Sequence, residues 1–150
     1  MGAIKLGHEV ARHLCALEHR KISSVYADKV GIEPDLSDKF EVKRDYGSLL
    51  KGKRVAVVED VLNTGKSVKK VVDLVRAAGG DVICVAVLCN RGKVTTKNVG
   101  DVPVLLALID LPLDVFTEEE CPLCKEGKPV NTKLGKGAAY LARKESAAKV

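Results

Sequence analysis

The sequence predicts an α/β domain with a mostly parallel sheet flanked by helices. Three apolar segments predict buried strands, at residues 51–60, 81–90 and 102–110. A segment with helical periodicity, residues 66–78, separates the first two of them. A strand, helix and strand in this order form a crossover that makes the two strands parallel. The length of 150 residues is typical of one domain.

The N-terminal part predicts one helix and two short strands. Residues 23–30 have the pattern of a short strand, and residues 31–38 have that of a turn. Residues 39–46 alternate between apolar and polar side chains, which indicates an exposed strand. Residues 5–20 predict a helix with four apolar side chains on one stripe: Leu6, Val10, Leu14 and Leu17.

The central segment predicts the core of the sheet. Residues 51–60 change from basic residues to an apolar run, which suits a strand at the centre of a parallel sheet. Gly79 and Gly80 predict the C-terminal cap of the helix that follows. The apolar face of that helix consists of Val68, Val71, Val72 and Val75.

The sequence changes character after Pro112. Residues 117–127, "TEEECPLCKEG", predict a short helix that is capped by Thr117 and has acids in its first turn. Residues 138–149 have helical propensity and a narrow apolar face. We expect an α/β domain over residues 1–116 and a C-terminal extension over residues 117–150, which docks on the same domain.

The positive charge is concentrated at the C-terminus. The formal net charge is +5, and residues 125–150 contain seven basic and two acidic residues, so they carry the whole excess. Only 3% of the residues are aromatic and there is no Trp, which disfavours a stacking platform for single-stranded nucleic acid. We expect a solvated tail, or one that attracts phosphorylated ligands, rather than a nucleic-acid interface.

Other features bear on the compartment and on metals. No apolar run approaches the ~20 residues that span a bilayer, and the N-terminus lacks a signal peptide's apolar segment, so we expect a cytoplasmic protein without membrane contact. The five cysteines are an odd number and do not suggest disulfides. Cys121 and Cys124 have metal-ligand spacing, but zinc needs four ligands and no second pair is near. Free thiols are therefore favoured over zinc, although a site shared across a dimer is conceivable.

The most informative segment is residues 57–67, "VVEDVLNTGKS", where a buried strand runs into two acids and a small polar loop. A nucleoside triphosphate P-loop also ends in Gly-Lys-Ser, but it needs glycine where this chain has Asp60. The loop opens a helix, where backbone amides and the helix dipole favour a phosphate. The predicted phosphate ligands are Asn63, Thr64, Gly65, Lys66 and Ser67.

Glu59 and Asp60 stand just before this loop. Two adjacent carboxylates there suit the 2- and 3-hydroxyl groups of a ribose whose 5-phosphate lies in the loop. The alternative is an ordinary strand followed by a capped helix. Two acids at the end of so apolar a strand favour the ligand site.

Residues 55–67, "VAVVEDVLNTGKS", resemble the phosphoribosyl pyrophosphate signature of the type I phosphoribosyltransferases. That signature has four apolar residues, two acids, two apolar residues and a small polar phosphate loop. Asn63 is a mild departure, because the family usually has a smaller residue there. The resemblance covers roughly residues 2–110 and implies the α/β fold of that family.

The resemblance implies roles for further residues. Lys29, in "YADK", resembles the basic residue that meets the pyrophosphate. Lys43 and Arg44 belong to a segment that resembles the mobile loop or hairpin closing over the site. Arg91, in "CNRG", resembles the arginine that orotate phosphoribosyltransferases present to the base. Together with the Glu-Asp form of the acid pair, Arg91 favours the orotate-like branch.

The implied activity is transfer of the 5-phosphoribosyl group from phosphoribosyl pyrophosphate (PRPP) to a nucleobase, with orotate favoured, in pyrimidine nucleotide biosynthesis. The resemblance also implies Mg²⁺ that bridges substrate oxygens, and a homodimer. Two alternatives share the phosphate ligands: a non-catalytic regulatory protein that binds PRPP, and a purine salvage phosphoribosyltransferase. The catalytic residues implied are Glu59, Asp60, Lys29, Lys43 and Arg44.

One departure concerns the N-terminus. The family core opens with a strand that leads into a pyrophosphate-binding loop, and Gly2 and Ala3 resemble the end of that loop, directly before its helix. The preceding strand and the N-terminal hood over the base are missing from the pattern. We expect an open sheet edge, and weak or absent transferase activity for residues 1–150 alone.

Overall fold

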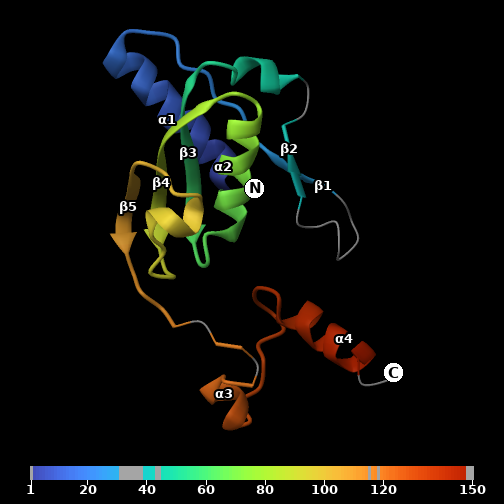
Figure 1. Ribbon diagram of the computed structural model, residues 1–150. Helices are drawn as coiled ribbons and strands as arrows, with labels where there is room; N and C mark the ends of the chain where they lie inside the picture. The colour runs from blue at the N-terminus through green and yellow to red at the C-terminus, as the bar shows by residue number, and fades with distance from the viewer. Residues whose placement is uncertain (1, 31–38, 43–44, 115, 118, 148–150) are drawn as a thin grey trace. The chain divides into compact units, whose positions relative to one another are not determined.

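The computed structural model describes residues 2–30, 39–42, 45–114, 116–117 and 119–147 of the 150-residue chain. The chain divides into two compact units, Met1–Leu113 and Asp114–Val150. The first unit contains the sheet with its flanking helices, and the second contains two helices (Figure 1).

Three parallel strands form the main sheet of the first unit, in the order β3-β4-β5. They are β3 (Arg54–Leu62), β4 (Asp81–Asn90) and β5 (Leu105–Asp110). Val57 lies opposite Val85, which lies opposite Leu105. The predicted parallel α/β class is confirmed, but β4 is central and β3 is an edge strand of the described sheet, so the central position predicted for residues 51–60 is wrong. An apolar sequence indicates that both faces of a strand are covered. It does not indicate whether both edges of the strand are hydrogen-bonded to other strands.

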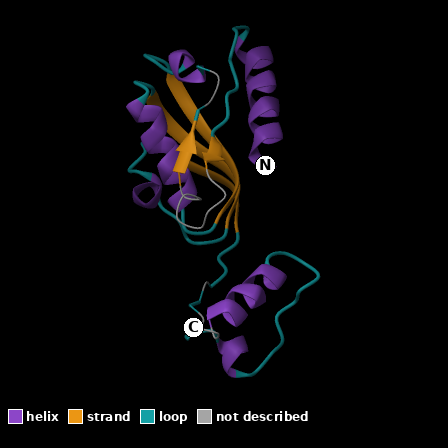
Figure 2. Ribbon diagram, turned by 90° about the vertical axis from the view of Figure 1, so that its right-hand side faces the viewer, coloured by secondary structure: helices purple, strands orange, loops and turns teal. Residues whose placement is uncertain are grey.

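Helices lie on both faces of this sheet. α1 (Gly2–Glu18) contacts β3 on one face, whereas α2 (Lys66–Ala77) and the short 3-10 helix η2 (Thr96–Val99) lie on the other (Figure 2). The core lies between α2, η2 and the sheet. Its most deeply buried large side chains are Leu62, Val72, Val85 and Val99.

The structure of α2 confirms the predicted helix and its apolar face. The exposed side carries an ion pair in which Lys69 Nζ lies 2.6 Å from Asp73 Oδ2. Gly79 has a φ of +79°, and its N–H donates to the Arg76 carbonyl at 2.9 Å, which caps the helix as predicted. The buried side chains are Val68, Val72 and Val75.

The N-terminal elements differ more from the prediction. In α1, Ala11 is buried, whereas Leu17 of the predicted apolar stripe is 75% exposed. The strand predicted over residues 23–30 is reduced to β1 (Asp28–Val30), which pairs antiparallel with β2 (Lys39–Glu41) in a separate two-stranded sheet. A strand forms only where another strand is placed to pair with it through backbone hydrogen bonds, and the local sequence does not specify that partner.

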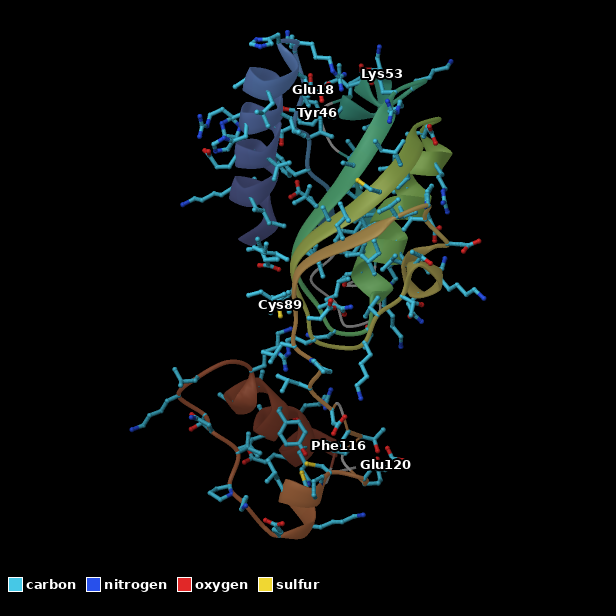
Figure 3. All side chains as sticks on the ribbon, turned by 90° about the vertical axis from the view of Figure 1, so that its left-hand side faces the viewer. Glu18, Tyr46, Lys53, Cys89, Phe116 and Glu120 are labelled. Carbon is cyan, nitrogen blue, oxygen red and sulfur yellow. The ribbon has the colours of Figure 1, made fainter. Side chains whose placement is uncertain are left out.

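A second 3-10 helix, η1 (Tyr46–Leu49), precedes β3. The ring of Tyr46 packs edge-on against that of Tyr26, with 6.4 Å between centroids. In Figure 3, Glu18 at the end of α1 and Tyr46 lie near the start of β3, whereas Cys89 lies at the opposite end of the sheet. α1 therefore runs antiparallel to β3, and its first residues point toward the carboxyl ends of the strands.

The second unit contains two short helices, α3 (Pro122–Lys125) and α4 (Gly137–Ala147). The N-cap of α3 is Cys121, so the predicted cap at Thr117 is wrong. Pro122 explains the shift, because its fixed φ suits the first position of a helix. The Thr117 hydroxyl instead donates to Glu120 Oε2 at 3.1 Å. No helix in the described ranges of either unit is both long and apolar enough to cross a bilayer.

Candidate functional site

The loop between β3 and α2 is fixed by the core behind it. Gly65 is buried, forms the N-cap of α2 and has a φ of +73°. A Cβ at this position would lie 3.0 Å from the Cγ1 atoms of both Val94 and Val99. The turn therefore requires glycine, both for its backbone conformation and for its lack of a side chain. The N–H of Lys69 donates to the Gly65 carbonyl at 2.8 Å and begins the helix.

A small cavity lies at the carboxyl end of β3. It has a volume of about 260 Å³ and is lined by residues 59–68. The Lys66 N–H lies 3.4 Å from Thr64 Oγ1, a long hydrogen bond that a ligand could replace. The first amides of α2 and its positive dipole end favour an anion in this place. All the predicted phosphate ligands line this cavity: Asn63, Thr64, Gly65, Lys66 and Ser67.

Glu59 and Asp60 line the same cavity and are both half-buried. The Asp60 N–H donates to Glu59 Oε1 at 2.9 Å, and the Val61 N–H donates to Asp60 Oδ1 at 2.8 Å. Burial raises the pKa of Glu59 above its ordinary value, and the hydrogen bond from the Asp60 amide opposes this effect. Each carboxylate has further lone pairs that can accept hydrogen bonds from ligand hydroxyl groups.

The segment after β4 packs directly against this loop, a contact that the sequence did not predict. The N–H groups of Arg91 and Gly92 both donate to the Leu62 carbonyl, at 2.8 and 3.2 Å. A Cβ on Gly92 would overlap the Asn63 carbonyl, so the close approach requires glycine. The two loops therefore form one structural element at the carboxyl edge of the sheet.

Asn90 is a residue whose role the sequence did not predict. It is buried at the end of β4, where its Nδ2 donates to the Val94 carbonyl and its Oδ1 accepts from the Val94 N–H, each at 3.0 Å. These bonds fix the turn that presents Arg91. The sequence contained a signal for this turn, because Asn stands between an apolar strand and an Arg-Gly pair, and Asn side chains often bond the backbone of turns.

Arg91, the predicted contact to the base, is half-buried. Its backbone is held on both sides, because its N–H donates to Leu62 and its carbonyl accepts from the Leu113 N–H at 2.8 Å. Its Nε is buried and has no hydrogen-bond partner within the described residues. An unsatisfied buried donor costs about 1–3 kcal/mol, more if charged, and a bound acceptor would offset this cost.

The remaining predicted site residues are placed differently. Gly2 and Ala3 form the first turn of α1 and do not belong to a loop before it, because the helical pattern is uninterrupted from Gly2 onward. Lys29 lies in β1, but its side chain is outside the described part of the chain. Lys43 and Arg44 lie outside the described residues.

Metal ligands are sparse. Where the structure describes the chain, no three His, Cys, Asp or Glu side chains gather in a group that could hold a metal ion. Cys121 and Cys124 thus have no third ligand of these types in that part of the chain. Glu59 and Asp60 offer two carboxylates at the cavity, which fits a hard cation that keeps most of its oxygen ligands from water and substrate.

Comparison with known proteins decides the family. Residues 1–120 match the family model of the phosphoribosyl transferase domain. The chain belongs to this family. The predicted resemblance of residues 55–67 to the type I phosphoribosyltransferases is therefore confirmed, and so is the α/β fold that it implied.

Curated relatives are named orotate phosphoribosyltransferase. The one from Caldanaerobacter subterraneus subsp. tengcongensis is 38% identical over 132 residues, which are 87% of this chain and 60% of the relative. The one from Thermotoga maritima is 37% identical over 139 residues, which are 91% of this chain and 65% of the relative. The chain thus spans less than two thirds of the length of these relatives.

Proposed function

We propose that this chain binds PRPP and transfers its 5-phosphoribosyl group to orotate, releasing pyrophosphate, as a step of pyrimidine nucleotide biosynthesis. The observation that carries the proposal is the cavity after β3, where two carboxylates and the amide-rich start of α2 face the same space. The names of the relatives support orotate as the acceptor.

The loop binds the 5-phosphate in this proposal. Gly65 lets the backbone approach the phosphate closely, and the first amides of α2 point toward it. The hydroxyl groups of Thr64 and Ser67 are exposed at the cavity and can donate two further hydrogen bonds. A phosphate held there places the ribose over the end of β3.

Glu59 and Asp60 hold the ribose hydroxyl groups. Glycosyl transfer develops positive charge on the ribose as the bond to pyrophosphate breaks, and two fixed carboxylates stabilise that charge. The protein needs no covalent nucleophile, because positioning of the base against the ribose carbon supplies much of the rate. Mg²⁺, when bound with the substrate near these carboxylates, neutralises charge on the phosphate oxygens.

Arg91 recognises the acceptor base. Within the described residues, its Nε is buried and has no hydrogen-bond partner. A bound ligand with an acceptor atom would satisfy it. Orotate carries a carboxylate that uracil and the purine bases lack, and a guanidinium pairs well with a carboxylate. This supports orotate over the other bases.

The leaving pyrophosphate would be met by Lys29, Lys43 and Arg44, with amides near Gly2 and Ala3 at the start of α1. We further propose that the protein is cytoplasmic and acts as a homodimer, in which a loop cation can come from the neighbouring subunit. Sedimentation at several protein concentrations tests the dimer.

The test of the function is an assay of orotate, uracil and purine bases with PRPP and Mg²⁺, together with calorimetry of PRPP binding. We expect PRPP binding, and nucleotide formation with orotate above that with other bases. Asp60→Asn should weaken PRPP binding by about 1.5–3 kcal/mol, the value of a charged hydrogen bond. Asp73→Asn, on the exposed side of α2, is the matched control and should bind PRPP normally.

Other outcomes would select the alternatives. PRPP binding without turnover of any base would favour a regulatory role, and faster turnover of a purine would favour salvage. Equal PRPP affinity in the Asp60 and Asp73 variants would remove the proposed role of the acid pair.

A further inference from the structure

The C-terminal unit contains a pair of cysteines that the proposed function does not use. Cys121 is partly exposed and Cys124 is exposed, and neither forms a disulfide in the structure. Cys121 is the N-cap of α3, and Cys124 is the third residue of that helix. The turn is closed by the Lys125 N–H, which donates to the Cys121 carbonyl at 3.1 Å. Residues three apart on a helical turn are neighbours on its surface, so this turn brings the two thiol groups to the same side.

The surroundings of Cys121 also favour its thiolate form. The hydrogen bond from the Cys124 amide lowers the pKa of Cys121, and the Cys124 thiol and the charge of Lys125 act in the same direction. Two other cysteines have different surroundings. Burial in β4 raises the pKa of Cys84, and the Cys15 sulfur is engaged by the backbone of Ile22, with the Ile22 N–H at 3.1 Å.

The two thiols are better suited to disulfide formation than to binding a metal. Zinc takes four ligands in structural sites, and the described residues provide no third His, Cys, Asp or Glu beside the two thiols. An intramolecular disulfide needs only the two thiols that this single turn brings together.

We propose that Cys121 and Cys124 form a redox-active dithiol, which low-molecular-weight disulfides such as oxidised glutathione convert to an intramolecular disulfide. The Cys121 thiolate attacks one sulfur of glutathione disulfide, forming a mixed disulfide and releasing one glutathione thiolate. The Cys124 thiolate then attacks the Cys121 sulfur of that mixed disulfide and releases the second glutathione. The protein loses two electrons and two protons, and one glutathione disulfide becomes two glutathione thiols.

The test is incubation of the full chain in glutathione buffers of graded ratio, followed by alkylation and peptide mass spectrometry. The peptide that contains both cysteines should lose the mass of two hydrogen atoms, reversibly, as the oxidised fraction rises. Cys124→Ser should instead accumulate glutathione on Cys121, because the resolving thiol is absent. Cys84→Ser is the matched control and should leave the internal disulfide unchanged.

Rates of alkylation of the reduced chain at neutral pH provide a second readout. Cys121 should react several-fold faster than Cys84. Two results would overturn the proposal: persistence of both thiols in strongly oxidising glutathione buffer, or stoichiometric zinc that co-purifies with the chain and blocks alkylation of the pair.

Discussion

Substitution of Gly65 by alanine tests whether the phosphate loop depends on its contact with the core. Two costs should add. The residue has a φ of +73°, and the left-handed conformation costs an alanine about 1–2 kcal/mol. The new Cβ would also lie 3.0 Å from the Cγ1 atoms of Val94 and Val99. Both valines are buried and cannot move without disturbing the core, and such overpacking costs about 1–3 kcal/mol.

The chain offers a control that separates these two costs. Gly52 has a similar φ of +68°, but nothing lies within 4 Å of the Cβ that alanine would add. Urea unfolding followed by circular dichroism should show a loss of about 2–5 kcal/mol for Gly65→Ala, and only the conformational part, about 1–2 kcal/mol, for Gly52→Ala. Calorimetry should show weaker PRPP binding only for Gly65→Ala. Equal losses of stability in the two variants would refute the argument that the core fixes the loop.

Three further predictions concern the rest of the site. Glu59→Gln should remove activity but stabilise the fold at neutral pH. The pKa of Glu59 is raised in the folded protein. The stability that protonated Glu59 contributes is therefore lost as the pH rises from the ordinary pKa, about 4.3, through the higher pKa of the folded state. Melting curves should therefore show a larger gain for the variant at pH 7 than at pH 4, and an equal gain at both would contradict the assignment. Asn90→Ala leaves the N–H and carbonyl of Val94 without their partner and should cost about 1–3 kcal/mol in urea unfolding; a loss below about 0.5 kcal/mol would show that the turn holds without the amide. Arg91→Met should raise the KM for orotate while leaving the affinity for PRPP unchanged. Steady-state kinetics measures the first quantity and calorimetry the second. A change in both the KM for orotate and the affinity for PRPP would indicate a purely structural role.

Local pattern was sufficient for the β3–α2–β4 unit. The apolar run before Glu59, the helical spacing of Val68, Val72 and Val75, and the glycines after α2 each reflect interactions within a few residues along the chain. The loop between β3 and α2, which we propose binds a phosphate, was predictable for the same reason, because its amides, hydroxyl groups and glycine are consecutive. The acid pair is adjacent to it in the sequence and lines the same cavity.

Predictions failed where the deciding contact is distant in the sequence. The edge position of β3 depends on which strands pair with it, and the short length of β1 depends on its pairing with β2. The cap of α3 was a separate, local failure. Thr117 was a plausible cap, but Pro122 set the start of the helix four residues later, after Cys121.

The sequence by itself determined the fold class and placed the acid pair and the glycine-containing loop at the end of one strand, because each feature arises from neighbouring residues whose propensities agree. Tertiary structure alone decided that Gly65 must accommodate Val94 and Val99, and that Gly92 must accommodate the carbonyl of Asn63. Both contacts join segments that are separated by about thirty residues and meet only because parallel strands end at the same edge of a sheet. A glycine in a sequence signals conformational freedom, but only the packed chain shows which atom takes the place of its missing side chain.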